Sequence, residues 1–208
     1  MGSRNREALL RGAAECVAAR GYARTTARDI AEASGVSLAA IGYHFGSTET
    51  LLEEVIYQGL ARWSDHLERL LADSPDGAAD PTVLWNRVQQ SFNGHRGVLL
   101  ASYELLLQAQ EKPQIRDRLA AALSAGRQGL AKIMAGVDPA TEPERGRRLG
   151  AFYYTMLSGL LTQWLIDPDH TPTGAELAQA LTEITGRVDD TKEFLRPARR
   201  DPYARNHC

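Results

Sequence analysis

Apolar residues recur at three- and four-residue steps through almost the whole chain, which is the spacing of an α-helix that buries one face. Alternating runs of Val, Ile or Thr, which are typical of β-strands, are missing. Because the chain has 208 residues and 43% of them are hydrophobic, its helices can enclose a full core. The sequence therefore predicts an all-α fold.

Glycine and proline residues divide this pattern into about nine helices. Gly21, Gly35 and Gly46 follow the first three helices, the segment Asp73–Gly77 follows the fourth, and further prolines and glycines separate the rest. The expected helices span residues 5–20, 27–34, 38–44, 48–72, 82–93, 96–111, 113–135, 143–166 and 174–187. We expect a small domain over residues 1–47, a larger one over 48–190, and a polar, loosely ordered tail over 191–208.

Charge and cysteine content exclude several classes of protein. The net charge is −2, so any DNA binding must come from a local surface. Cys16 and Cys208 form no metal-type pair, and Cys16 is interpreted as a small buried hydrophobe in preference to a redox sensor. The apolar stretch 151–166 is too short for a membrane helix, and no apolar region follows Arg4 and Arg6, so neither a membrane span nor a signal peptide is expected. We expect a cytoplasmic protein.

Motifs of enzymes are also missing. No two glycines are separated by a single residue, no lysine follows a glycine, and no Gly-x-Ser-x-Gly run occurs. The five histidines are scattered without the spacing of metal ligands. We therefore expect no enzyme, no metal site and no cofactor.

The segment 26–37 carries the clearest local signals. Thr26 and Asp29 have the spacing of a capping box, in which each side chain accepts a hydrogen bond from the other residue's backbone N–H. Gly35 can adopt the left-handed conformation that ends a helix, and Ser37 is expected to cap the next one. Two short helices around such a turn are typical of a helix-turn-helix, although a tight corner in a helical bundle would give the same pattern.

The run from Gly35 to Leu52, together with Gly21–Thr26, closely resembles the N-terminal domain of transcriptional regulators of the TetR/AcrR family over about residues 6–55. The resemblance implies a three-helix DNA-binding domain followed by a helical ligand-binding and dimerisation domain. It further implies a homodimer that represses transcription from a palindromic double-stranded DNA operator and leaves it when a small molecule binds. The rival interpretations are an enzyme and a helical interaction protein that does not bind DNA.

When the family's contacts are transferred position by position, Arg28 and the start of the third helix, residues 37–40, would contact bases. Tyr43 and His44 would lie at the phosphate and groove edge, and Thr26 and Thr48 would contact phosphate. The residues implied in DNA binding are Thr26, Arg28, Ser37, Leu38, Ala39, Ala40, Gly42, Tyr43, His44 and Thr48. The family often has an aromatic residue at position 42 and Lys at position 48, whereas this chain has Gly42 and Thr48. The net charge of the first 50 residues is only +1, so fewer phosphate contacts are expected. Arg4 and Arg6 are expected on a solvated surface arm, from which they could also reach DNA.

The remaining helices are expected to bind the effector and form the dimer. The helix 143–166 is apolar on more than one side, so we expect it to form a four-helix dimer interface with Leu177, Leu181 and Ile184, rather than only the centre of a monomer. The mostly apolar candidates for the pocket favour a hydrophobic or aromatic effector, although most would serve equally as core residues. These candidates are Trp63, His66, Trp85, Phe92, His95, Tyr103, Glu104, Gln108, Met134, Phe152 and Met156.

Overall fold

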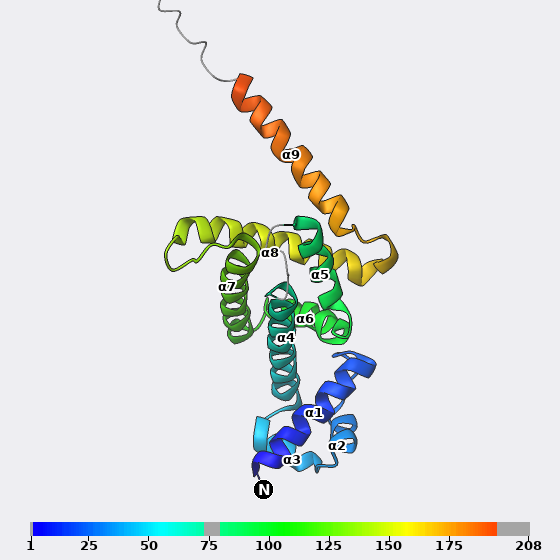
Figure 1. The fold of residues 1–208 in the computed structure, drawn as a ribbon. Coiled ribbons are helices and arrows are strands. Elements are labelled where there is room, and N and C mark those ends of the chain that lie inside the picture. Colours follow the sequence, from blue (N-terminus) through cyan, green and yellow to red (C-terminus); the bar gives the residue numbers. More distant parts are fainter. Residues whose placement is uncertain (1, 73–79, 195–208) are drawn as a thin grey trace, which may run out of the picture.

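The computed structural model describes residues 2–72 and 80–194, and this part of the chain consists of α-helices without any strand (Figure 1). The all-α prediction is therefore confirmed, and so is the expected number of helices among the described residues. They are α1 (Gly2–Arg20), α2 (Ala27–Ser34), α3 (Leu38–Phe45), α4 (Thr48–Ala72), α5 (Pro81–Phe92), α6 (Arg96–Gln108), α7 (Pro113–Ala135), α8 (Pro143–Ile166), the short 3-10 helix η2 (Pro168–His170), and α9 (Gly174–Phe194).

Three helix ends differ from the sequence prediction by three residues or more. Helix α1 begins at Gly2, three residues before the expected start. Helix α6 ends at Gln108 instead of residue 111, because the N–H groups of Gln110 and Glu111 donate to carbonyl oxygens three residues back and residues 109–111 form turns. Helix α9 continues to Phe194, since no glycine or proline stops it before residue 197. The boundary at 73–77 and residues 195–208 of the expected tail lie outside the described residues.

The first core joins α1, α2 and α3 to the beginning of α4, to α6 and to the start of α7. Its buried side chains come from each of these helices and include Leu9, Val17, Ile30, Ile41 and Leu51. Figure 1 shows α4 running from this N-terminal group into the larger body of the molecule. Because Leu51 and Ile56 are fully buried, a displacement of α4 must move the N-terminal core as well.

The second core lies between α4, α5, α6, α7 and α8. Trp85, Phe92, Leu99 and Leu160 are among its buried side chains. Helices α7 and α8 are in backbone contact at Gly150, where an added Cβ would lie 2.2 Å from the Arg127 carbonyl oxygen. The glycine therefore sets how closely these two helices pack.

Helix α9 projects away from the rest of the molecule (Figure 1). It is attached at its beginning, where the Gly174 N–H donates to Asn86 Oδ1 on α5 at 3.0 Å and Leu177 packs against the second core. Further along, Ile184 is 60% exposed. No helix in the described ranges combines the length and apolar character needed to cross a membrane.

Candidate nucleic-acid interface and effector cavity

The beginning of α2 is fixed by a complete capping box. The Asp29 N–H donates to Thr26 Oγ1 at 3.3 Å, and the Thr26 N–H donates to Asp29 Oδ2 at 2.9 Å. Asp29 also pairs with the Arg20 guanidinium on α1. Hydrogen bonds from Thr26, followed by the charge of Arg20, lower the pKa of the Asp29 carboxyl. Helix α2 is thus held to α1 at the end where its capping residue and Arg28 are exposed.

The turn after α2 has the geometry expected of a helix-turn-helix. Gly35 has a φ of +66°, in the left-handed region, and its N–H donates to the Glu32 carbonyl oxygen. Ser37 stands at the capping position of α3, but among the described residues its side chain makes no capping bond, contrary to the prediction. The reason is that the Ala40 N–H already donates to the Ser37 carbonyl oxygen at 3.0 Å. The Ser37 hydroxyl is left on the surface.

Helix α3 buries Ile41, packs the half-buried Ala40 and Phe45 against the first core, and exposes its other face. Leu38 is 50% exposed and Tyr43 is 85% exposed. Figure 1 places α3 at the end of the molecule opposite α9. Of the residues implied in DNA binding, the exposed ones are Thr26, Arg28, Ser37, Leu38, Ala39, Gly42 and Tyr43, and the half-buried ones are Ala40, His44 and Thr48.

Two features beside α3 differ from expectation. Ser47 caps α4, because its Oγ accepts the Thr50 N–H at 3.1 Å, and the Ser-x-x-Thr spacing is the signal that could have identified it. Thr48 occupies the first position of the helix. Arg4 and Arg6 are exposed, as expected, but they belong to α1, which begins at Gly2, and not to an arm outside the helices. The Arg6 guanidinium lies 5.1 Å from the centre of the Phe45 ring, which keeps it beside α3.

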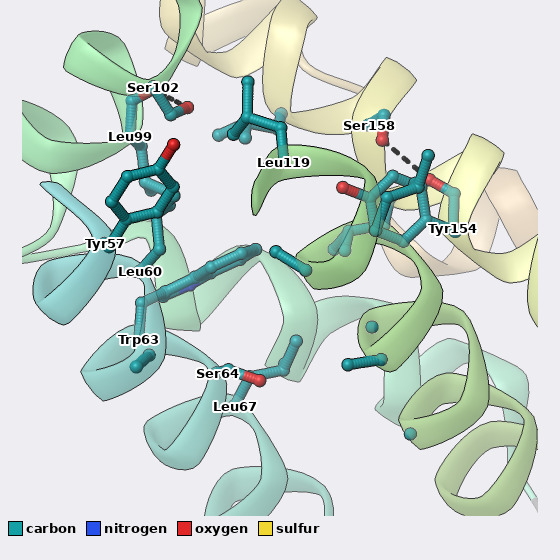
Figure 2. Close-up of a pocket in the computed structure, with 18 of the residues that line it drawn as sticks. Tyr57, Leu60, Trp63, Ser64, Leu67, Leu99, Ser102, Leu119, Tyr154 and Ser158 are labelled. Carbon is teal, nitrogen blue, oxygen red and sulfur yellow. Dashed lines mark hydrogen bonds between the residues drawn. The ribbon is translucent and has the colours of Figure 1, made fainter. Parts of the chain in front are cut away.

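A cavity of about 800 Å³ lies between α4, α6, α7 and α8. Figure 2 shows Tyr57 and Trp63 pointing into it from α4, with Leu119 and Tyr154 on the opposite side. Burial raises the pKa of both Tyr57 and Tyr154, so these hydroxyls are neutral at neutral pH. Ser102 and Ser158 add hydroxyl groups that donate to carbonyl oxygens of their own helices.

Charged residues reach the cavity from its exposed parts. Asp65 and Glu68 of α4 and Arg116 of α7 line it, and all three are exposed residues. The half-buried lining is aromatic, aliphatic or hydroxyl-bearing. In chemical terms the interior suits an apolar ligand with few hydrogen-bonding groups. No three His, Cys, Asp or Glu side chains are placed to hold a metal ion in the described part of the chain.

Trp63 and Tyr103 are the two predicted pocket residues that line this cavity. The Trp63 indole N–H donates to Ser91 Oγ at 3.1 Å, and the Tyr103 hydroxyl bonds Thr162 at 2.6 Å. The other candidates lie elsewhere in the described structure. Those packed in or against the second core are Trp85, Phe92, Met134 and Met156, and Phe152 is 43% exposed on α8.

The predicted polar anchors of the pocket have different partners. The rings of His66 and His95 stack on each other with centroids 5.2 Å apart, outside the cavity lining. Glu104 Oε2 accepts the Ala23 N–H at 3.1 Å, and Gln108 Nε2 donates to the Tyr22 hydroxyl at 2.7 Å. Glu104 and Gln108 therefore connect α6 to the loop between α1 and α2.

Tyr57, Tyr154 and the residues of α7 also line the cavity, and they were not among the residues predicted from the sequence. Helix α7 lines the cavity with small side chains, which leave space where larger ones would fill the core; they are Ala120, Ala122, Ala125, Gly126 and Gly129. This Ala- and Gly-rich composition was the available signal. Tyr57 and Tyr154 could not be distinguished from ordinary core aromatics without the rotation of each helix.

Family models and solved structures match both parts of the chain. Residues 9–55 match the model described as "Bacterial regulatory proteins, tetR family", and residues 76–187 match "Tetracyclin repressor-like, C-terminal domain". No curated protein matches the chain in sequence.

Three solved structures illustrate the similarity. SCO7518 from Streptomyces coelicolor A3(2), named as a transcriptional regulator, is 26% identical, with 88% of this chain and 98% of that one covered and a TM-score of 0.59. A regulator from Saccharomonospora viridis in complex with choline is 22% identical, with 87% and 95% covered and a TM-score of 0.63. The multidrug binding protein EbrR with imidazole is 24% identical, with 86% and 91% covered and a TM-score of 0.60.

Proposed function

The chain belongs to the tetR family of bacterial regulatory proteins, which are DNA-binding regulators of transcription, and on this premise we propose that it is a repressor released from its operator by a small apolar or aromatic effector. The observation that carries the proposal is that α4 begins beside the exposed helix α3 and continues as a wall of the cavity. One rigid element thus joins the DNA-reading surface to the ligand space. The role proposed is regulatory and not enzymatic.

The DNA-binding part of the proposal rests on α2 and α3. In a helix-turn-helix the second helix enters the major groove and the first crosses the backbone. Here α3 presents Leu38 and Tyr43, and Arg28 is exposed at the beginning of α2. At the beginning of α4 the Glu49 carboxylate accepts hydrogen bonds from its own N–H and from Ser47, so a DNA phosphate would have to displace this carboxylate to reach the first-turn N–H groups.

A palindromic operator requires two reading helices about 34–36 Å apart, and therefore a dimer. We place the second copy against α8 and α9, which would form a four-helix interface. Phe152 on α8 and Ile184 on α9 are 43% and 60% exposed, so each presents apolar surface that a partner can cover. Phe152, which was expected in the pocket, is assigned to this interface instead.

The proposed route from the cavity to the DNA-binding helices runs through the first half of α4, which begins at Thr48. The Arg118 guanidinium of α7 lies 3.7 Å from the centre of the Tyr57 ring and bonds Glu54 at 3.2 Å. Tyr57 lines the cavity, and Leu51 on the same helix is buried in the N-terminal core. A ligand that displaces Tyr57 or α7 therefore acts on the helix that positions α3, which is the two-state coupling that release requires.

The effector class follows from the lining of the cavity. Its half-buried aromatic and aliphatic groups favour an apolar or aromatic molecule, and its neutral hydroxyls can orient one or two polar atoms. The complexes of EbrR with imidazole and proflavin, and of the Saccharomonospora viridis regulator with choline, support a small molecule as the ligand in this fold.

The DNA-binding part is tested by gel retardation of the full chain on DNA flanking its own gene, over a range of salt concentrations. Arg28→Ala and Tyr43→Ala should each weaken specific binding about tenfold or more. Arg69→Ala is the matched control, because Arg69 is an exposed arginine in the last turn of α4, at the end of that helix away from α3. If no DNA is retarded specifically at low salt, or if Arg28→Ala and Tyr43→Ala have no effect, the assignment is wrong and a role in protein interaction replaces it.

The cavity is tested with the fluorescent aromatic probe 1-anilinonaphthalene-8-sulfonate. We expect the probe to bind the full chain and to release bound DNA, and Trp63→Leu to weaken both effects. His66→Leu is the control, because it lies three positions further along α4 and outside the cavity lining. Equal probe binding by both variants would contradict the assignment of the cavity as the effector site.

A further inference from the structure

The first turn of α3 presents an apolar surface where a recognition helix meets base edges. Its side chains are Leu38, Ala39 and Ala40, preceded by the hydroxyl of Ser37. Leu38 is 50% exposed and Ala39 is exposed, while the helix directs Ile41 into the core. An amide, guanidinium or carboxylate, which are the groups that make bidentate contacts with bases, is absent from this turn.

The bases differ in how they accommodate such a surface. In the major groove thymine exposes a C5 methyl group beside its O4 acceptor, whereas guanine, adenine and cytosine expose hydrogen-bonding atoms and no methyl group. Leucine placed against those atoms would desolvate them without supplying a partner, which is costly. When leucine packs against the thymine methyl group, the apolar surface of both groups is removed from water, which is favourable.

We propose that Leu38 reads a thymine in each half-site of the operator by packing against its C5 methyl group. This inference rests on the proposed function, in which α3 enters the major groove. It identifies a specificity determinant that recognises shape and apolar surface instead of a hydrogen-bonding pattern.

The Leu38 side chain extends further from α3 than that of its exposed neighbour Ala39, which is a single methyl group, and the larger exposed side chains lie elsewhere. Tyr43 lies five positions further along α3, which corresponds to about 7.5 Å along the helix axis, so it faces a different base pair. Arg28 belongs to α2, and its guanidinium matches guanine, not a methyl group. The methyl contact is therefore localised at one position of each half-site.

Deoxyuridine scanning tests the proposal, because uracil keeps every hydrogen-bonding group of thymine and lacks only the methyl group. The full-length protein first selects its operator from a pool of random duplexes. Each thymidine of the selected duplex is then replaced by deoxyuridine, and the affinity is measured by fluorescence anisotropy. We expect one position per half-site to lower the affinity about fourfold, the effect of losing one buried methyl group, and about fifteenfold when both half-sites are changed.

The variant Leu38→Ala tests whether Leu38 causes the loss of affinity that deoxyuridine produces. It should bind the unmodified operator more weakly than the wild type and lose most of its sensitivity to deoxyuridine at that position. Tyr43→Phe, which keeps the ring of an exposed α3 residue, should retain the full sensitivity. Because Leu38 is half-exposed, its replacement should leave the helical circular dichroism and the urea midpoint unchanged.

The outcomes separate this inference from the proposed function. Specific binding with no deoxyuridine effect at any thymine overturns the inference and leaves the proposed function standing. An equal deoxyuridine effect in the wild type and in Leu38→Ala also overturns it, since another residue would then read the methyl group. If no sequence is enriched from the pool, the proposed function fails and this inference fails with it.

Discussion

Gly59 controls how closely α4 and α6 approach each other, and its replacement by alanine should force them apart. A Cβ at this position would lie 2.4 Å from Val98 Cγ2 and 3.2 Å from Val98 Cβ. Carbon atoms in contact are normally about 3.5–4.0 Å apart, so the helices or the valine must shift by about 1 Å. Val98 is β-branched and has little rotamer freedom, so the backbone must take up most of this shift.

The size of the effect follows from two opposing contributions. Overpacking a core by one methyl group costs about 1–3 kcal/mol, whereas alanine is about 1 kcal/mol more favourable than glycine within a helix. Gly59→Ala should therefore lower the free energy of unfolding by up to about 2 kcal/mol. Gly42→Ala is the matched control. Apart from its chain neighbours and the backbone of its own helix, no atom of the described structure lies within 4 Å of the methyl group that it adds to α3, so it should raise the free energy of unfolding by about 1 kcal/mol.

The assay is urea unfolding of Gly59→Ala, Val98→Ala and the double variant. Val98→Ala removes the methyl group that causes the 2.4 Å contact, so the second substitution should offset the first. We expect a favourable coupling energy of about 1–2 kcal/mol in this double-mutant cycle. If Gly59→Ala changes the free energy of unfolding equally with and without Val98→Ala, the two helices do not meet at this point and the reasoning is refuted.

Three further predictions concern the helix ends of the N-terminal region and the contact between α7 and α8. Ser47→Ala should cost about 1 kcal/mol of stability in urea unfolding because it removes a cap, and Ser37→Ala, at a position with no capping bond, should cost nothing measurable. The pKa of Asp29 is lowered, so its stabilising contribution is present above about pH 4 and is lost as the pH falls through the lowered pKa. The stability difference between wild type and Asp29→Asn should therefore shrink between about pH 5 and pH 3, and a constant difference would contradict this. Gly150→Ala should lower the free energy of unfolding by about 3 kcal/mol or more, because its methyl group meets a backbone carbonyl of α7 at 2.2 Å.

The helices were predictable because their ends are encoded locally. The Thr26–Asp29 capping box and the left-handed Gly35 depend on neighbouring residues only, and both form as the sequence indicates. The end of α6 was misplaced because residues 109–111 leave the α-helical hydrogen-bond pattern and form turns, and no glycine or proline among these three residues marks the change. The end of α9 was misplaced because polar composition was taken as a sign of a tail, whereas composition alone does not stop a helix.

The exposed residues of α2 and α3 could be inferred from the sequence because they all lie within one short segment. The cavity could not, because four helices line it and a helix rotated by one position presents different residues. Trp85 and Phe92 have the same residue types as the lining aromatics but face the second core. Glu104 and Gln108 were expected in the pocket and instead bind the α1–α2 loop, a contact between residues that are distant in the sequence.

These two bonds bear on the proposed coupling between the cavity and the DNA-binding helices. Helix α6 holds the N-terminal helices independently of α4. Gly97 packs so closely on α1 that an added Cβ would lie 2.9 Å from the Ala18 Cα, and Glu104 holds the loop that follows. The N-terminal helices cannot follow α4 alone without breaking these contacts. Since α4 and α6 both line the cavity and cross at Gly59, a ligand that changes their crossing would act on both attachments at once.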